Sequence, residues 1–342
     1  MGRPAGSGRS GAPSPWVAAR EGRPADVAYL EGLLAAGDLD PNARDPASRR
    51  QPGATLLHAS ARAGRLPAVQ LLLRAGAHPA ARDADGATPL HLAAAQRGDG
   101  AAGLVEALLL RAGPAGAAVH EALDHQRQSP LHAAAFAGSL AAVRAILAHA
   151  GRVAAAQTAI QAPLGPEAAA RAARYVDWRD RLGWTALHLA AKQGHATVVA
   201  LLADEAGARL DTADARQGAT PLHDAVRSGS PATVDALLAR GADRDRKDGK
   251  GRTPGELAGR DRTLLRLLAG ERWSAIRAEA EAEVEAERSA KPEEAEGPRA
   301  EPPGAREKEG PAAAGARREL DAWQPFGPAA SATAEISVDF DF

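Results

Sequence analysis

The sequence predicts an all-α fold in which about seven short helical units stack into one elongated domain, a solenoid. Composition is the first observation, because the apolar residues are mostly Ala, Leu and Val and aromatic residues make up only 3% of the chain. This mixture suits closely packed short helices better than β-sheets rich in aromatic residues. The second observation is a tetrapeptide that recurs along the chain, and the third is an apolar stripe at helical spacing after each copy.

The tetrapeptide begins with a hydroxyl residue and usually ends with histidine. Successive copies start 33, 41, 56, 35 and 33 residues apart. The hydroxyl residue suits a helix N-cap, and the proline that often follows suits the first helical position, where its missing N–H sacrifices no hydrogen bond. The copies run from Thr55 to His58, Thr88 to His91, Ser129 to His132, Thr185 to His188 and Thr220 to His223, with a variant from Thr253 to Glu256.

Each copy is followed by the rest of a two-helix unit. A glycine such as Gly138 or Gly229, placed after the histidine, is expected to end the first helix with a positive φ. A second helix is then predicted on an apolar stripe. The stripes are Val69/Leu72/Leu73, Val105/Leu108/Leu109, Val143/Ile146/Leu147, Val198/Leu201/Leu202 and Val234/Leu237/Leu238.

A period near 33 residues with this tetrapeptide resembles the ankyrin-repeat family. The resemblance implies helix–turn–helix units joined by β-hairpin fingers, and a partner protein held by the fingers and the concave face. It also implies that each tetrapeptide histidine forms hydrogen bonds near its helix start. Because these histidines occur once per unit, stacking spreads them along the solenoid, so we expect a structural role for them and no metal site.

The solenoid is predicted to span residues 15–270, after a flexible basic leader at 1–14. The first unit is interpreted as degenerate, with Trp16 in the slot that histidine occupies elsewhere. At the other end Glu256 replaces the histidine, but with Thr253 it fits the S/T-x-x-E capping box, so the helix start is preserved.

Two spacings exceed the period and indicate insertions. The 41-residue spacing before Ser129 is interpreted as local loop extension. The 56-residue spacing before Thr185 holds a longer insertion near residues 152–174, in which a segment from Pro166 is rich in helix formers. This insertion either projects from the finger side between two units or forms a mobile flap.

An acidic helical extension is predicted over residues 271–289, beyond the last unit. Its apolar stripe is expected to dock on that unit and comprises Trp273, Ile276, Ala280 and Val284. Residues 290–342 are predicted to be a disordered tail, because a stretch dominated by Pro, Glu, Ala, Gly and Arg cannot bury enough apolar surface to become ordered.

A short binding motif is predicted at residues 320–342, where aromatic residues return as Trp323, Phe326, Phe340 and Phe342. The terminal ISVDFDF alternates apolar and polar residues like an edge-adding strand, and its last residues resemble a C-terminal ligand of PDZ-type domains. An alternative function is therefore a targeting adaptor whose C-terminal motif engages a receptor domain.

Composition argues against several functional classes. The chain has no cysteine, which excludes disulfides, cysteine metal sites and thiol catalysis. No apolar run approaches the roughly 18 to 20 residues that cross a bilayer. The sequence contains no phosphate-binding glycine loop, nucleophile elbow or paired catalytic carboxylates. We therefore expect no enzymatic activity, no cofactor, no metal and no small-molecule substrate.

Charge is distributed unevenly along the chain. The first 270 residues carry 33 Lys and Arg against 26 Asp and Glu, whereas the last 72 carry 9 against 17. A net charge of -1, mixed signs in the fingers and the lack of an aromatic stacking platform argue against nucleic acid as the partner. We expect a monomer outside its complex, in the cytoplasm or nucleus. The Arg- and Ser-rich leader leaves an organelle address as an alternative.

Two fingers contain the candidate partner-binding residues of the solenoid. In the segment 243–252 basic residues outnumber acidic ones, which favours an acidic partner segment; they are Arg244, Arg246, Lys247, Lys250 and Arg252. The other finger places Trp178 beside Arg179 and Arg181. Either the Trp178 ring anchors the preceding insertion against the solenoid, or it is exposed as an interface hot spot next to the arginines.

Overall fold

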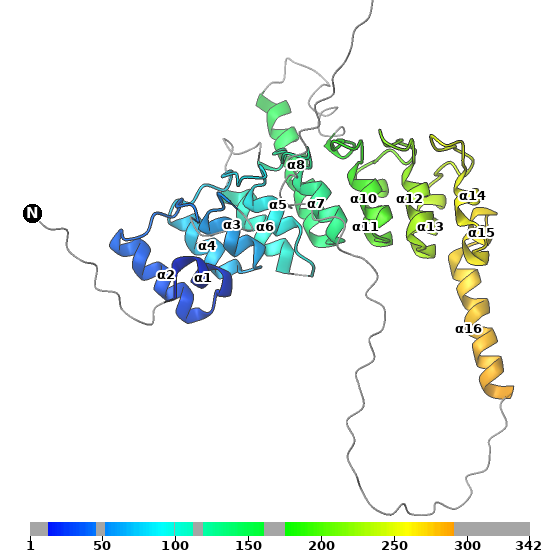
Figure 1. Ribbon diagram of the computed structural model, residues 1–342, viewed down its shortest axis with the longest axis horizontal. Helices are drawn as coiled ribbons and strands as arrows, with labels where there is room; N and C mark the ends of the chain where they lie inside the picture. Colours follow the sequence, from blue (N-terminus) through cyan, green and yellow to red (C-terminus); the bar gives the residue numbers. More distant parts are fainter. Residues whose placement is uncertain (1–12, 46–51, 99, 112–118, 161–174, 291–342) are drawn as a thin grey trace, which may run out of the picture.

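The computed structural model describes residues 13–45, 52–98, 100–111, 119–160 and 175–290. Within these residues the regular secondary structure is helical, with one isolated antiparallel bridge between Arg44 and Thr55. The prediction of an all-α fold is confirmed. Figure 1 shows the helices in pairs, stacked side by side, with the fingers along one edge of the stack. None of the described helices is both long and apolar enough to cross a membrane.

Seven helix pairs make up the stack in the described part of the chain. The first helix of each pair is called the inner helix below, and the second the outer helix. The pairs are α1 (Pro15–Glu21) with α2 (Pro24–Ala36), α3 (Leu56–Arg62) with α4 (Leu66–Arg74), α5 (Pro89–Ala94) with α6 (Gly100–Arg111), α7 (Pro130–Ala137) with α8 (Leu140–Ile160), α10 (Ala186–Lys192) with α11 (Ala196–Asp204), α12 (Pro221–Ser228) with α13 (Pro231–Leu238), and α14 (Pro254–Ala258) with α15 (Arg262–Leu268). A final helix, α16 (Trp273–Ala290), follows them.

The inner helices begin and end where the sequence predicts. Thr185 caps α10, and its hydroxyl accepts the backbone N–H of His188. At α14 the Glu256 carboxylate accepts the Thr253 N–H at 3.0 Å while the Thr253 hydroxyl accepts the Glu256 N–H at 3.3 Å, which is the capping box. Gly138 ends α7 with a φ of 75°, a left-handed conformation that suits glycine.

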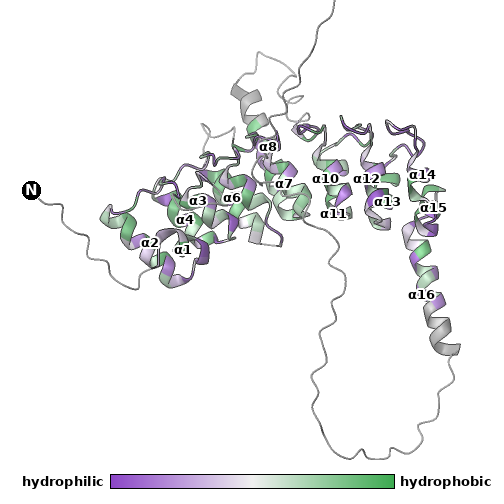
Figure 2. Cartoon of the chain, viewed as in Figure 1, coloured by the Kyte–Doolittle hydropathy of each residue, from purple (hydrophilic) through white to green (hydrophobic). Residues whose placement is uncertain are grey.

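The core runs along the stack between neighbouring units. One leucine at the start of each of the five central inner helices is buried, and small residues such as Ala93, Ala134 and Ala190 are completely buried between adjacent helices. Burial of these side chains needs a neighbour on each side, which is why the units are stable only as a stack. Figure 2 shows hydrophobic residues on the helices and mainly hydrophilic ones along the fingers of the later units.

The predicted alignment of the first unit is wrong by one residue. Ser14 is the N-cap of α1, and its hydroxyl accepts the Val17 N–H at 3.3 Å. Val17 therefore stands where the other units have histidine, and Trp16 stands where they have leucine. The ring of Trp16 is partly buried against the core, as the leucines of the other units are more fully. The serine cap and the partly buried Trp16, two residues after it, thus set the alignment.

The start of the long insertion is a helix in the structure. Outer helix α8 continues through Gly151 to Ile160, far past the length of the other outer helices. Residues 151–160 contain no proline and are mostly helix formers, so the hydrogen-bond ladder continues across Gly151 at a modest cost. The remainder of the insertion, including the segment from Pro166, lies outside the described residues.

Helix α16 contacts the last units only at its first turns. Ile276 is buried, and the backbone N–H of Trp273 donates to the Asp235 carboxylate at 3.1 Å. Ala280 is exposed, so the prediction that it belongs to the docked stripe is wrong. The helix leaves the stack after this point and runs away from the fingers (Figure 1).

Candidate protein-interaction surface

The tetrapeptide histidines connect each inner helix to the finger that leads to the next unit. In His58, Nδ1 accepts the Thr55 backbone N–H at 3.1 Å, and Nε2 lies 3.1 Å from the carbonyl oxygen of Ala87. Because a carbonyl oxygen only accepts hydrogen bonds, Nε2 carries the proton and donates it. The same pair of contacts recurs at His91, His132, His188 and His223.

Burial keeps these histidines neutral at physiological pH. Desolvation lowers the pKa of His58, His91 and His188 to about 4, although the hydrogen bond to the carbonyl acts in the opposite direction. Each ring is thereby committed to bonds within the fold. In the described part of the chain, no three His, Asp or Glu side chains are grouped so that they could hold a metal ion.

Five successive fingers are each built around a buried aspartate, a feature that sequence reasoning missed. In Asp180 one carboxylate oxygen accepts the backbone N–H of Leu182 at 2.8 Å and of Trp184 at 2.9 Å. These bonds fix the finger as a tight turn, in which the Asp180 carbonyl also accepts the Gly183 N–H. The equivalent aspartates are Asp83, Asp124, Asp214 and Asp248, and all five are buried. Each finger is named below by its aspartate.

The finger tips, meaning the residues that follow each buried aspartate, are joined to one another by backbone hydrogen bonds. The Arg181 N–H donates to the Gln126 carbonyl at 2.9 Å, and the Ala215 N–H to the Leu182 carbonyl at 3.0 Å. The next step runs from the Gly249 N–H to the Gln217 carbonyl at 2.7 Å. A Cβ on Gly183 would lie 2.4 Å from the Ala215 nitrogen, so this glycine permits the close approach. The tips therefore form one continuous row.

Four successive tips in this row carry one cation each and no acidic residue. These tip cations are Arg127, Arg181, Arg216 and Lys250. All four are exposed, and none takes part in an ion pair within the described residues. At the turns themselves the acidic residues are the buried aspartates, and one carboxylate oxygen of each accepts backbone N–H groups. Other acids of these fingers, such as Asp243 and Asp245, lie on the arms that lead to the tips. The row is consequently positive on its outer side.

Arg127 stands out in this row because its backbone is left-handed, with a φ of 60°. The corresponding position of the other tips is Gly86, Gly183, Gly218 or Gly251, for which such a φ is free of strain. A side chain in this conformation costs about 1 kcal/mol. The protein thus has a cation at a tip where its own backbone favours glycine.

The five basic residues of the Asp248 finger that were predicted to bind a partner differ from one another in their surroundings. Arg252 donates through Nε and Nη2 to the Asp248 carboxylate at 3.1 and 2.9 Å, so it belongs to the finger itself. Arg244 donates to the Leu268 carbonyl at 2.8 Å and braces the end of α15. Arg246, Lys247 and Lys250 are exposed, and their charged ends form no ion pair with the residues that the structure describes. The structure therefore separates two bracing arginines from three cations that face solvent.

Trp178 lies at the end of a stack of rings. Its ring meets that of Tyr175 edge to face, with centroids 5.2 Å apart. Tyr175 is buried, contacts the ring of His120 and donates its hydroxyl to the His120 carbonyl at 2.7 Å. His120 in turn meets His149 of α8 at 5.2 Å. Trp178 is thus packed toward the base of the long insertion, while Arg179 and Arg181 beside it are exposed.

The second tryptophan of this finger makes the stronger polar contacts. The Trp184 Nε1–H donates to the Asp214 carboxylate at 3.0 Å, and the ammonium of Lys192 lies 4.1 Å from the centre of the Trp184 ring. Equivalent positions near the ends of the inner helices hold Phe136, Lys192 and Arg227, which are exposed or partly exposed. Because stacked helices turn equivalent positions the same way, these three side chains form a second row beneath the fingers.

The candidate residues of the tail, Trp323, Phe326, Phe340 and Phe342, lie outside the described residues.

The signal for the Trp184 contacts was present in the sequence as a tryptophan directly before a helix cap, but the sequence alone did not show its neighbours.

Comparison with known structures places this architecture among solved repeat domains. The ankyrin repeat domain of human ASB11 matches with a TM-score of 0.57 and 24% identity, over 75% of this chain and 97% of that domain. The ankyrin repeat domain of Bcl-3, described as a unique member of the IkappaB protein family, matches with a TM-score of 0.54 and 25% identity, over 76% of this chain and 99% of that domain.

Comparison with protein families rests on the sequence and gives the same result. The family model for ankyrin repeats in three copies matches residues 16–114, 57–158 and 153–248 in overlapping placements. These matches cover well over half of the chain and follow the units described above. The chain therefore belongs to the ankyrin-repeat family.

Proposed function

We infer that this chain is a non-catalytic protein-interaction module that holds an acidic segment of a partner protein along its finger tips and the adjoining inner helices. Ankyrin repeats are generic protein–protein interaction modules. The row of four tip cations is the observation that supports an acidic partner in this case. These cations lie on one edge of the stack and have no compensating acid on their tips.

The row beneath the fingers supports the same partner chemistry. Lys192 adds an exposed cation to it and Phe136 a partly exposed aromatic ring, whereas Arg227 is paired with Asp224 at 3.2 Å and Asp248 at 3.5 Å. Arginine and aromatic side chains are enriched at the energetic centres of protein interfaces. A partner segment that combines carboxylates with one or two apolar side chains therefore fits this surface best, and we take residues 15–270 as the interacting unit.

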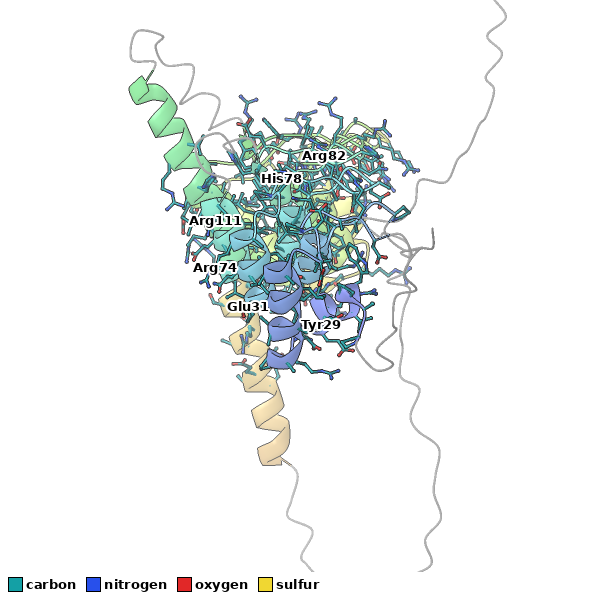
Figure 3. The ribbon with its side chains drawn as sticks, turned by 90° about the vertical axis from the view of Figure 1, so that its left-hand side faces the viewer. Tyr29, Glu31, Arg74, His78, Arg82 and Arg111 are labelled. Atoms are coloured by element: carbon teal, nitrogen blue, oxygen red, sulfur yellow. The ribbon has the colours of Figure 1, made fainter. Side chains whose placement is uncertain are left out.

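A pair of matched charge reversals tests this function. Arg181→Glu with Arg216→Glu reverses two adjacent tips, whereas Arg74→Glu with Arg111→Glu makes the same change in net charge on the outer helices. In Figure 3, Arg74 and Arg111 lie on a different flank from Arg82, which marks the finger edge. Partners captured by the full chain are identified by mass spectrometry, and the affinity of each for the two variants is then measured.

We expect the tip variant to lose at least about tenfold in affinity for a genuine partner and the outer-helix variant to lose less than about twofold. Raising the salt concentration should weaken the unaltered chain in the same direction, because exposed charges are screened. If every identified partner binds both variants equally well, the tip row is not the binding surface. Competition by DNA or RNA for the same tips would instead favour a nucleic-acid partner.

A further inference from the structure

Four positive side chains follow one another along the tip row without a neutralising group. Backbone bonds from Arg181 to Gln126, from Ala215 to Leu182 and from Gly249 to Gln217 hold the four tips in line. Like charges on adjacent tips repel each other, and within the described residues no carboxylate forms an ion pair with them. The row is therefore a surface that a negatively charged, extended segment would stabilise.

The chain itself contains a negatively charged segment near its end. Residues 319–342 carry Glu319, Asp321, Glu335, Asp339 and Asp341, and contain no Lys or Arg. The preceding residues 291–318 differ, because their acidic and basic residues are equal in number. Negative charge is therefore concentrated at the far end of the tail, together with the aromatic residues Trp323 and Phe326.

The connection between the two is long enough. An extended chain gains about 3.3 to 3.6 Å per residue, so residues 291–318 can span roughly 90 to 100 Å. The 18-residue helix α16 leads away from the fingers by about 27 Å. To return to the fingers, the tail has to cover the length of α16 and then the length of an inner helix, which is shorter than α16. This path is shorter than the span of residues 291–318. A tethered segment also has a high effective concentration at a site that it can reach.

We propose that residues 319–342 bind in cis along the tip cations from Arg127 to Lys250, so that the chain's own acidic segment occupies the partner-binding row. This inference rests on the proposed function in one respect, which is that the tail and the partner bind to the same row of tip cations. A partner's acidic segment binds by displacing the tail, and the tail sets a threshold of affinity that a partner must exceed.

The absence of cysteine from the sequence makes a direct test straightforward. Spin labels are placed on the full chain at Gln217→Cys, on an exposed tip, and at Ser331→Cys, in the acidic segment. Distances between the labels are measured by double electron–electron resonance. The control pair replaces the tip label with Glu106→Cys, an exposed position on outer helix α6.

We expect a short-distance population for the tip pair that is reduced severalfold in high salt and in the Arg181→Glu, Arg216→Glu background. The Arg74→Glu, Arg111→Glu background should leave it unchanged. A distance distribution that is the same in all backgrounds overturns the proposal. A mixture of singly labelled chains should give no short distances, and if it does, the contact is between two chains and the cis proposal fails.

A second measurement leaves the solenoid unaltered. The five carboxylates of residues 319–342 are changed to amides in the full chain, and a fluorescent synthetic peptide of residues 319–342 is titrated into both forms. We expect the amide variant to bind the peptide at least about tenfold more tightly, because its own tail no longer competes. Equal affinity overturns cis occupancy.

Failure of this inference and failure of the proposed function give different results. If neither form binds the peptide while an identified partner still requires Arg181 and Arg216, the proposed function stands and this inference falls. If the peptide binds at the tips but no identified partner depends on them, the inference stands and the proposed function falls.

Discussion

The indole Nε1–H of Trp184 donates a 3.0 Å hydrogen bond to the carboxylate of Asp214, which joins one finger to the next. We predict that Trp184→Phe lowers the free energy of unfolding by about 1 to 3 kcal/mol, because an aromatic ring is kept in place while a hydrogen bond to a buried carboxylate is lost. Urea denaturation at pH 7 measures the change. A control at Lys192, Lys192→Met, should cost less than about 1 kcal/mol, since it removes only the exposed cation above the ring. An effect of Trp184→Phe no larger than that of the control would contradict the prediction.

Trp178→Ala is predicted to destabilise the fold. The ring packs on buried Tyr175, so its removal should lower the free energy of unfolding by about 2 to 4 kcal/mol and reduce the melting temperature. Thermal unfolding followed by circular dichroism provides the measurement. The neighbouring Arg179→Ala serves as the control, because that side chain is exposed.

This pair of variants also separates the two explanations for Trp178. Unchanged stability in Trp178→Ala, accompanied by weaker partner binding, would contradict the anchor hypothesis and favour the interface hot spot. The ring stack that ends on His149 favours the anchor.

The stabilising effect of His188 is predicted to depend on pH. Its pKa is lowered by burial from 6.5 to about 4, so the folded chain binds fewer protons there than the unfolded chain between these values. The contribution of the neutral ring is therefore complete above pH 6.5 and is lost as the pH falls toward 4. We expect the stability difference between the unaltered chain and His188→Gln to shrink by up to about 3 kcal/mol between pH 7 and pH 4.5.

Urea denaturation of both forms across this range checks the prediction. Comparing two chains cancels the opposite effect of buried carboxyls, such as Asp224, whose pKa burial raises to about 7. A constant difference across the range would show that His188 gains a proton without loss of its bonds.

Arg127→Gly is predicted to separate binding from stability. Glycine relieves the left-handed backbone but increases the freedom of the unfolded chain, so the free energy of unfolding should change by less than about 1 kcal/mol. Binding of the 319–342 peptide should weaken, because one tip cation is lost. Gly183→Arg is the converse variant and should destabilise the fold, since a side chain there meets the Ala215 backbone. Stronger peptide binding by Arg127→Gly would contradict the assigned role of Arg127.

The helical framework was predictable because its determinants are local in sequence. Thr185, His188 and Gly194 lie within ten residues of the sequence and specify a cap, a buried ring and a helix end. The Trp16 alignment failed because the first unit lacks the histidine that marks the cap elsewhere, and only Ser14 sets it.

The candidate surface was less predictable because it depends on contacts across units. Asp180 shares its place five residues before the helix cap with Asp83, Asp124 and Asp248, but the bonds to Leu182 and Trp184 that give this recurrence its meaning are visible only in the structure. Arg252 and Lys250 look alike in the sequence, yet one is bound to Asp248 and the other faces solvent. The partner of Trp178 was hidden for the same reason, since the role of Tyr175 follows from His120, far away in the sequence.

The bonds between finger tips have a mechanical consequence. Their lengths lie between 2.7 and 3.0 Å, a narrow range that hydrogen-bond geometry enforces. The outer helices instead meet through apolar side chains and through exposed side-chain ion pairs, such as Arg144 with Glu205, which can rearrange. When the stack bends, the spacing between its outer helices should therefore change while the spacing between its finger tips stays constant. A ligand lying along Arg127, Arg181, Arg216 and Lys250 meets the same charge spacing at every curvature.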